Sequence, residues 1–210
     1  MDAYKLIKDD IQKFIRTWLK TGMIYNPQIG GEFFKNKNLI QSKYDFYKTE
    51  QEYKEKFVRA YEQNSFLVAL FDGSCFQIYY EFEANRTDNY LKKANICYLP
   101  CVTEGEILHE YLRLDYDTSV DNSFFHPTTH LHVGFREGMR IPADEIPLFS
   151  EFFEFVMYLY YEEQYLQIIG KKSVSDTYDK QQKGSRSKRI PISNELLNFV
   201  HLKMSKLKKV

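Results

Sequence analysis

The sequence has few cysteines, few prolines and no long apolar run. Its 210 residues include three cysteines, six prolines and one tryptophan. A small, odd number of cysteines argues against a disulfide framework and favours a reducing compartment. No apolar run approaches the roughly 20 residues of a membrane-spanning helix, and the first residues lack the order of a signal peptide. We therefore expect a cytoplasmic protein with no membrane partner.

Motifs of the common nucleotide enzymes are also missing. The chain contains no Walker loop, no glycine-rich dinucleotide fingerprint and no nucleophile elbow. These absences argue against a nucleotide-hydrolysing or dinucleotide-dependent enzyme. We expect no cofactor.

Net charge is zero over the whole chain, but two parts of it carry opposite charge. Residues 1–170 contain 18 basic and 26 acidic side chains, a net charge of −8, whereas residues 171–210 contain 11 and 3, a net charge of +8. Lys and Arg attract nucleic acid through their local density, so neutrality does not exclude that partner. A basic tail that is solvated, or that packs against the acidic body, would give the same pattern.

The spacing of apolar residues predicts helices at both ends of the chain. Helical periodicity marks residues 3–20 and 45–62, with a loop of little regular structure at 23–44. Residues 147–169 predict a long, buried helix with Pro147 at its first position. A last helix is expected at 193–207, with an apolar stripe formed by Leu196, Leu197, Val200 and Met204.

Between these helices the period changes from 3.6 to 2. Strand-like runs lie at residues 65–71, 75–83, 94–99, 109–116 and 129–135. Asp72-Gly73 between the first two is a strong hairpin signal. Short connections favour a five-stranded antiparallel meander, and the fold class is α+β.

We expect one domain over residues 1–210. Its parts are a helical part at 1–62, the sheet at 63–136, the long helix at 137–170, a basic loop at 171–190 and the last helix at 191–210.

A cluster of polar side chains is predicted on one face of the last hairpin. Strand alternation puts His130 and His132 on one face of their strand, and Arg113 and Asp115 on one face of theirs. If the two strands pair with their apolar residues toward the core, these four side chains share the other face. His126 would then stand at the mouth of the hairpin loop.

This combination is suited to acid–base chemistry on a phosphodiester. Two imidazoles can serve as general base and general acid near neutral pH, an aspartate fixes the imidazole tautomer, and an arginine holds a phosphate. Metal-free RNA cleavage, in which the 2′-hydroxyl attacks the phosphate, needs no more. His-x-His with an aspartate is also a common zinc or iron ligand set. The same sequence pattern would also result if the histidines were only solvated and Arg113 and Asp115 formed a cross-strand charge pair without a function.

Further residues are candidates for substrate binding: Arg136, Arg140, Gln77 and Tyr79. Gln77 and Tyr79, which lie on a predicted strand, would equally suit an ordinary solvated sheet face. Cys97, Cys101 and His109 lack a fourth ligand and the usual zinc-knuckle spacing, so we expect buried or half-buried thiols there.

The sequence resembles a bacterial family, domain of unknown function 2290 (DUF2290), along nearly its whole length. The motifs that carry the resemblance are Asp72-Gly73-Ser74 with Gln77, Tyr80 and Phe82, then Leu112–Asp117, His126-Pro127, His130–His132, Arg140–Pro142, the aromatic helix around 152–161 and Glu195 with His201. Residues 65–135 are also similar to small toxins of a bacterial toxin–antitoxin class. That second similarity implies an RNA target, and the loop before His126 is longer here and contains Phe124 and Phe125.

Two hypotheses follow. The first is an RNA-cleaving toxin or phage-defence effector, a ribonuclease-type enzyme. In it, His130 and His132 transfer protons, and His126 can replace either of them. Arg113 holds the phosphate and Asp115 orients an imidazole. The second is a non-catalytic subunit of a defence complex that binds a partner protein, favoured by 17 Phe and 17 Tyr. An antitoxin is the expected partner of the first.

Overall fold

The computed structural model of this chain describes residues 2–30, 33–42, 47, 49–84, 89–119, 127–135, 140–143 and 146–170. The fold is α+β, as the sequence predicts. The helices are α1 (Ala3–Trp18), α2 (Glu50–Glu62), α3 (Phe149–Tyr160) and α4 (Glu162–Ile169). The strands are β1 (Ile24–Tyr25), β2 (Leu39–Gln41), β3 (Val68–Leu70), β4 (Cys75–Ala84), β5 (Asn89–Leu99), β6 (Val102–Thr103), β7 (Glu106–Ile107), β8 (Leu112–Asp117), β9 (Thr129–Val133) and β10 (Arg140–Pro142). None of the described helices is long and apolar enough to cross a membrane.

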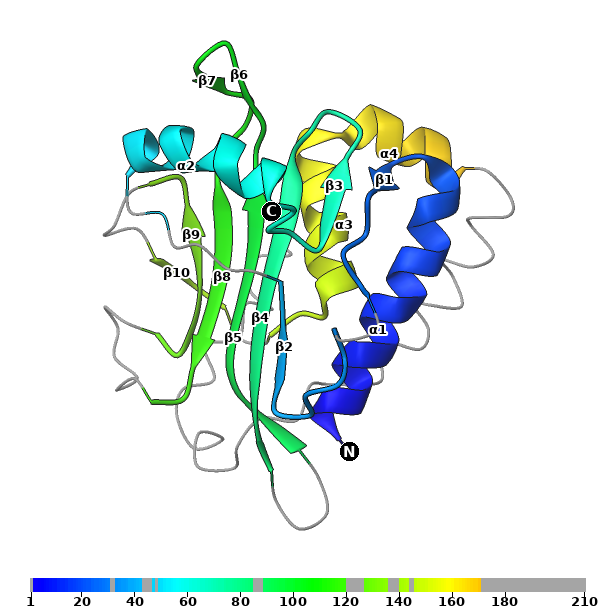
Figure 1. The fold of residues 1–210 in the computed structure, drawn as a ribbon, viewed down its shortest axis with the longest axis vertical. Helices are drawn as coiled ribbons and strands as arrows, with labels where there is room; N and C mark the ends of the chain where they lie inside the picture. The colour runs from blue at the N-terminus through cyan, green and yellow to red at the C-terminus, as the bar shows by residue number, and fades with distance from the viewer. Residues whose placement is uncertain are drawn as a thin grey trace, which may run out of the picture.

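One large antiparallel sheet organises the described residues (Figure 1). Its strand order is β1-β3-β4-β5-β8-β9-β10, and β2 pairs with the far part of β4. The predicted meander is confirmed in the run from β3 to β9. β6 and β7 form a separate small hairpin. Gly73 turns the chain between β3 and β4 with a φ of 90°, which a side chain at that position would strain.

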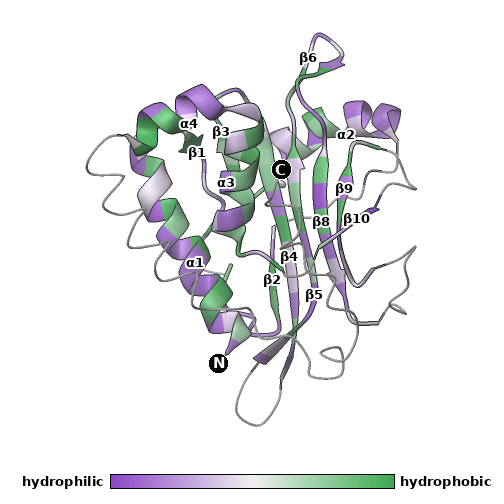
Figure 2. Ribbon diagram, turned by 180° about the vertical axis from the view of Figure 1, so that it is seen from behind, coloured by the Kyte–Doolittle hydropathy of each residue, from purple (hydrophilic) through white to green (hydrophobic). Residues whose placement is uncertain are grey.

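The main hydrophobic core lies between the sheet and the layer formed by α1, α3 and α4. Phe14 and Trp18 of α1 meet Phe153 of α3 with ring centroids 4.7 and 4.9 Å apart. Phe76 of β4 lies 5.4 Å from the same ring. Hydrophilic and hydrophobic residues alternate along the strands and along α1 (Figure 2), as expected for elements with one buried face. This layer covers one face of the sheet and leaves the other for different contacts.

α2 covers only one end of that other face. Tyr53 and Phe57 of α2 form a second buried cluster with Cys75, Cys97 and Tyr111. Beyond this cluster, the same face of β5, β8 and β9 carries polar side chains. The arrangement leaves a polar region next to an apolar one, on the side of the sheet away from α1 and α3.

Several sequence predictions need correction. The 23–44 segment contains β1 and β2, which are too short to show a period-2 pattern. α2 begins at Glu50 because Thr49 caps it, so the predicted start at residue 45 is wrong. β10 and the β6–β7 hairpin are likewise too short to recognise from periodicity. The sheet therefore has eight strands rather than five.

The predicted helix at 147–169 is two helices. α3 begins at Phe149 rather than at Pro147, and the chain breaks at Tyr161, whose φ of −133° and ψ of 33° are not helical. The Tyr161 hydroxyl donates to Asp72 Oδ2 at 2.6 Å and lies 2.7 Å from the Tyr98 hydroxyl. These contacts with the β3–β4 turn and with β5 hold the break in place. The last helix and the basic loop lie outside the described residues.

A buried carboxylate joins α1 to the start of α3 and makes stability pH-dependent. Asp10 accepts hydrogen bonds from Ser150 N (3.0 Å) and Ser150 Oγ (2.5 Å). Burial raises the pKa of Asp10 to about 6, against the lowering effect of those hydrogen bonds. Because the folded pKa exceeds the unfolded value near 4, the charged form is disfavoured in the folded protein. The contribution of Asp10 to stability therefore falls as pH rises from about 4 through about 6.

We expect Asp10→Asn to remove this pH dependence. Relative to the wild type, the variant gains about 2 kcal/mol in its free energy of unfolding as pH rises from 4 to 7, since one pKa unit corresponds to about 1.4 kcal/mol. Urea denaturation of both proteins at several pH values measures the difference. A gap between the two proteins that stays constant over this range would contradict the expectation.

Candidate functional site

Two rows of mostly polar residues cross the face of the sheet that lies away from α1 and α3, from β4 to β10. Directly opposed residues of antiparallel strands point to the same face. The register gives one row as Gln77, Cys97, Arg113, His132 and Arg140. The neighbouring row is Tyr79, Asn95, Asp115, His130 and Pro142. The predicted sharing of one face by Arg113, Asp115, His130 and His132 is thus present.

Asp115 on β8 is the centre of this arrangement. Its Oδ1 accepts from Asn95 Nδ2 at 2.6 Å and from Arg113 Nε at 2.9 Å. Its Oδ2 accepts from Arg113 Nη2 at 2.8 Å and lies 3.1 Å from His132 Nε2. A carboxylate has about four lone-pair directions, and these three neighbours occupy most of them. Asp115 is therefore held in one orientation.

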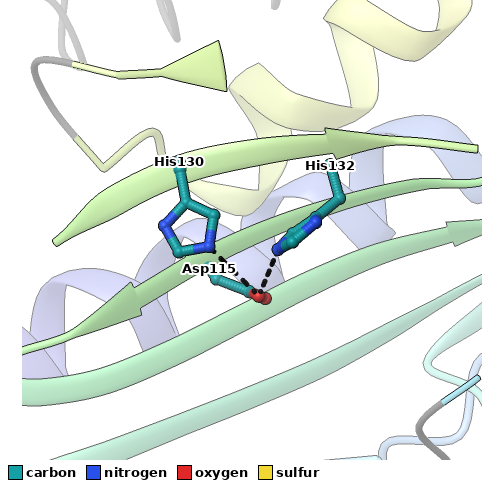
Figure 3. Close-up of side chains that lie close together, drawn as sticks. All are labelled: Asp115, His130 and His132. Atoms are coloured by element: carbon teal, nitrogen blue, oxygen red, sulfur yellow. Dashed lines mark ion pairs between the residues drawn. The ribbon is translucent and has the colours of Figure 1, made fainter. Parts of the chain in front are cut away.

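The two histidines of β9 face this carboxylate (Figure 3). His130 Nε2 lies 3.7 Å from Asp115 Oδ2, and the two imidazole centroids are 4.8 Å apart. His130 Nδ1 lies 2.6 Å from the Pro127 carbonyl oxygen, which can only accept a hydrogen bond. The proton of a neutral His130 therefore sits on Nδ1, and Nε2 presents its lone pair to the site. The helix in the blue colour of α1 lies behind the strands in this view, on the far side of the sheet from the three side chains.

The cluster, which we call the Asp115 site (Asn95, Arg113, Asp115, His130 and His132), is largely shielded from water. Arg113, His130 and His132 are each less than a tenth exposed. Burial acts to raise the pKa of Asp115, but the hydrogen bond from His132 and the positive charge of Arg113 outweigh it. The pKa of this carboxyl consequently lies below its ordinary value, so Asp115 is ionised at neutral pH. A buried carboxylate with a paired cation and two imidazoles is a common feature of functional sites.

The same residues can be compared with the needs of a metal ion. Asp115, His130 and His132 each offer a ligand atom, and these atoms lie within 4.8 Å of one another. However, both carboxylate oxygens already accept hydrogen bonds from Arg113, and a divalent ion at Oδ2 would lie next to that guanidinium. Like charges in a region of low dielectric repel strongly. The hydrogen-bonded arrangement therefore favours proton transfer over metal binding.

The predicted binding residues lie in different surroundings. Arg140 is the cross-strand neighbour of His132 on β10, opposite Arg113 on β8, so two arginines flank one imidazole. Gln77 is fully buried and its amide donates to the Ser65 carbonyl. The Tyr79 hydroxyl donates to Glu81 Oε2 at 3.0 Å. His126 and Arg136 lie outside the described residues.

Asn95 is the member of the site that the sequence pattern did not single out. It lies on β5, in the register row of Asp115, and is 8% exposed. The available signal was a polar residue inside the apolar run 94–99, on the face opposite Ala94 and Ile96. That signal identifies a buried polar group, but not its partner.

The cysteines and the remaining described histidine stand apart from this cluster. Cys97 is buried and Cys101 is partly exposed, which agrees with the expectation of buried or half-buried thiols; Cys75 is also buried. His109 falls within the predicted strand 109–116, but the observed strand β8 begins only at Leu112. The His109 ring stacks on Tyr160 with ring centroids 4.6 Å apart. Among the described residues, the group of potential metal ligands that comes together is the one at Asp115.

Comparison with known proteins places the site within a family. Residues 102–203 match the family model described as "Uncharacterized conserved protein (DUF2290)". The match begins after the Asp72–Phe82 motifs and includes β8 and β9, which carry Arg113, Asp115, His130 and His132. No curated protein and no solved structure matches the chain. The match over residues 102–203, just under half of the chain, supports its assignment to the DUF2290 family.

Proposed function

We propose that this protein is a metal-free RNA-cleaving enzyme that acts as a toxin or phage-defence effector in the cytoplasm. The observation that carries the proposal is the Asp115 site, in which one ionised carboxylate orients His132 and is bound by Arg113 at 2.8 Å. Two imidazoles 4.8 Å apart then face the same region with different hydrogen-bonding partners. This is the arrangement that paired acid–base catalysis needs.

The different partners give the two histidines different roles. His130 donates from Nδ1 to Pro127 and presents a lone pair at Nε2, so it takes the proton from the 2′-hydroxyl. The 2′-oxygen then forms a bond to phosphorus as the bond from phosphorus to the 5′-oxygen breaks. His132, held through Nε2 by Asp115, gives a proton to the leaving 5′-oxygen from Nδ1. The products are a 2′,3′-cyclic phosphate and a 5′-hydroxyl.

Arginines on both sides of His132 are the reason for proposing a phosphate group as the reacting part of the substrate. Arg113 and Arg140 are its cross-strand neighbours on β8 and β10. A guanidinium binds phosphate oxygens in a two-pronged manner and stabilises the charge that develops on them. The basic residues of 171–210 supply the attraction for the rest of the RNA backbone. An antitoxin or a defence-complex subunit would restrain the activity in the host.

Expression in bacteria tests the proposal. We expect the wild-type protein to slow growth and degrade cellular RNA, because its substrate is present in every cell. His130→Ala removes the proposed base and should restore growth and intact RNA. His109→Ala is the matched control, since it removes an imidazole that stacks on Tyr160 away from the site, and it should remain toxic.

Equal growth and equal RNA integrity with the wild type and with His130→Ala would contradict the proposal. That result would favour the alternative of a non-catalytic subunit, for which a co-purifying partner is the positive evidence. Loss of toxicity in both histidine variants would also count against a specific role for the Asp115 site.

A further inference from the structure

The outer face of α3 and α4 carries a row of large apolar side chains. Phe155, Tyr158, Leu159 and Leu166 are 44–57% exposed. The inner face of α3 is already packed in the core through Phe149, Phe152, Phe153, Val156 and Met157. α3 is therefore apolar on both sides, although helices at a protein surface normally have one polar face. Large exposed apolar side chains that gather on neighbouring helices often mark a surface that another segment or protein covers.

The stretch of chain that carries this row is acidic. Residues 141–170 contain no Lys, Arg or His. The acidic side chains along α3 and α4 are Glu151, Glu154, Glu162 and Glu163. A segment that binds here would need an apolar stripe with basic residues beside it.

The chain itself supplies such a segment. Residues 193–207 predict an amphipathic helix with Leu196, Leu197, Val200 and Met204 on one face. Lys203, Lys206, Lys208 and Lys209 follow or interrupt this stripe, and the whole stretch 171–210 carries a net charge of +8. Apolar and charged features of the two surfaces are thus complementary.

The connection is long enough for this contact. α4 ends at Ile169, and 22 residues, 171–192, separate Gly170 from the start of the predicted helix. An extended chain of that length reaches up to roughly 70 Å, whereas α3 with 12 residues is only about 18 Å long. A tether of this kind keeps the segment at millimolar effective concentration.

We propose that residues 193–207 dock with their apolar stripe on Phe155, Tyr158, Leu159 and Leu166 of the same chain. The lysines of the segment then lie beside the glutamates of α3 and α4. Seven of the eleven basic residues of 171–210 precede residue 190 and stay outside the contact. The basic loop is thereby anchored at both ends, at Gly170 and at the docked segment. This inference does not depend on the proposed RNA cleavage.

Hydrogen–deuterium exchange of the full-length protein tests the docking. Amides of 193–207 are expected to be protected in the wild type while light scattering gives the mass of a monomer. Leu159→Asp puts a charge in the apolar row and should reduce that protection about tenfold or more. Leu197→Asp, on the segment itself, should do the same. Val58→Asp is the matched control, because Val58 is 52% exposed on α2, and it should leave the protection unchanged.

Three results would overturn the inference. One is the absence of protection at 193–207 in the wild-type monomer. Another is protection that Leu159→Asp and Leu197→Asp leave unchanged. The third is protection found only at concentrations at which the protein dimerises, which would mean that a second copy covers the row.

Discussion

Replacing His132 with glutamine is expected to lower the rate of RNA cleavage by about 10²–10⁴-fold, the usual contribution of a positioned acid or base. The glutamine amide can still donate to Asp115, whose Oδ2 lies 3.1 Å from the histidine Nε2. It cannot carry a proton to the leaving oxygen. The substitution therefore keeps the geometry of the Asp115 site while it removes the proton transfer. Single-turnover cleavage of a short RNA by the purified variant measures the loss.

A matched substitution separates chemistry from folding. His109→Gln changes the same side chain at a position where the imidazole stacks on Tyr160, and it should cleave at the wild-type rate. Thermal unfolding of both variants shows whether they are folded. A folded His132→Gln protein with an undiminished rate would exclude His132 as the acid.

Replacing Arg113 with methionine is expected to have the largest effect on stability. Arg113 donates from Nε and Nη2 to Asp115, and its side chain is only 8% exposed. Without it, an ionised carboxylate stays buried with no cationic guanidinium beside it, next to Asn95 and the two histidines. Removal of one member of a buried ion pair typically costs about 3–5 kcal/mol. Urea denaturation at pH 7 should show a loss of that size in the free energy of unfolding.

The double variant Arg113→Met/Asp115→Leu tests the cause of that loss. With both charges removed, no unpaired carboxylate remains, and similar pairs replaced by apolar residues are often neutral in stability. The double variant should therefore be more stable than Arg113→Met alone. If it is less stable, then lost packing rather than an uncompensated charge explains the effect of the single substitution.

The site was predictable because strand alternation is a local property. The spacing of Arg113 and Asp115, and of His130 and His132, determines which residues of each strand share a face. Pairing of β8 with β9 follows from their succession along the chain and their apolar residues. The position of Asp115 between several hydrogen-bonding partners, and the hydrogen bond from Asn95, were not predictable. They depend on the register between β5 and β8. A shift of one residue would have placed Asn95 on the core face.

The elements that escaped prediction were short or depended on distant contacts. β1, β2 and β10 contain two or three residues each, too few for a periodic pattern, and the pairing with β3, β4 and β9 defines them. Nothing in the continuous apolar pattern of 147–169 indicates the break at Tyr161. That break is held by hydroxyl contacts with Asp72 and Tyr98, which lie far away in the sequence.

The products of the reaction test the central claim most directly. Purified wild-type protein is incubated with a defined RNA in the presence of EDTA, and the new ends are identified by mass spectrometry. A metal-free reaction through the 2′-hydroxyl predicts 2′,3′-cyclic phosphate and 5′-hydroxyl ends, formed at the same rate with and without EDTA. No cleavage at all, or 5′-phosphate ends that form only when a divalent metal is added, would contradict the roles assigned to His130, His132 and Asp115.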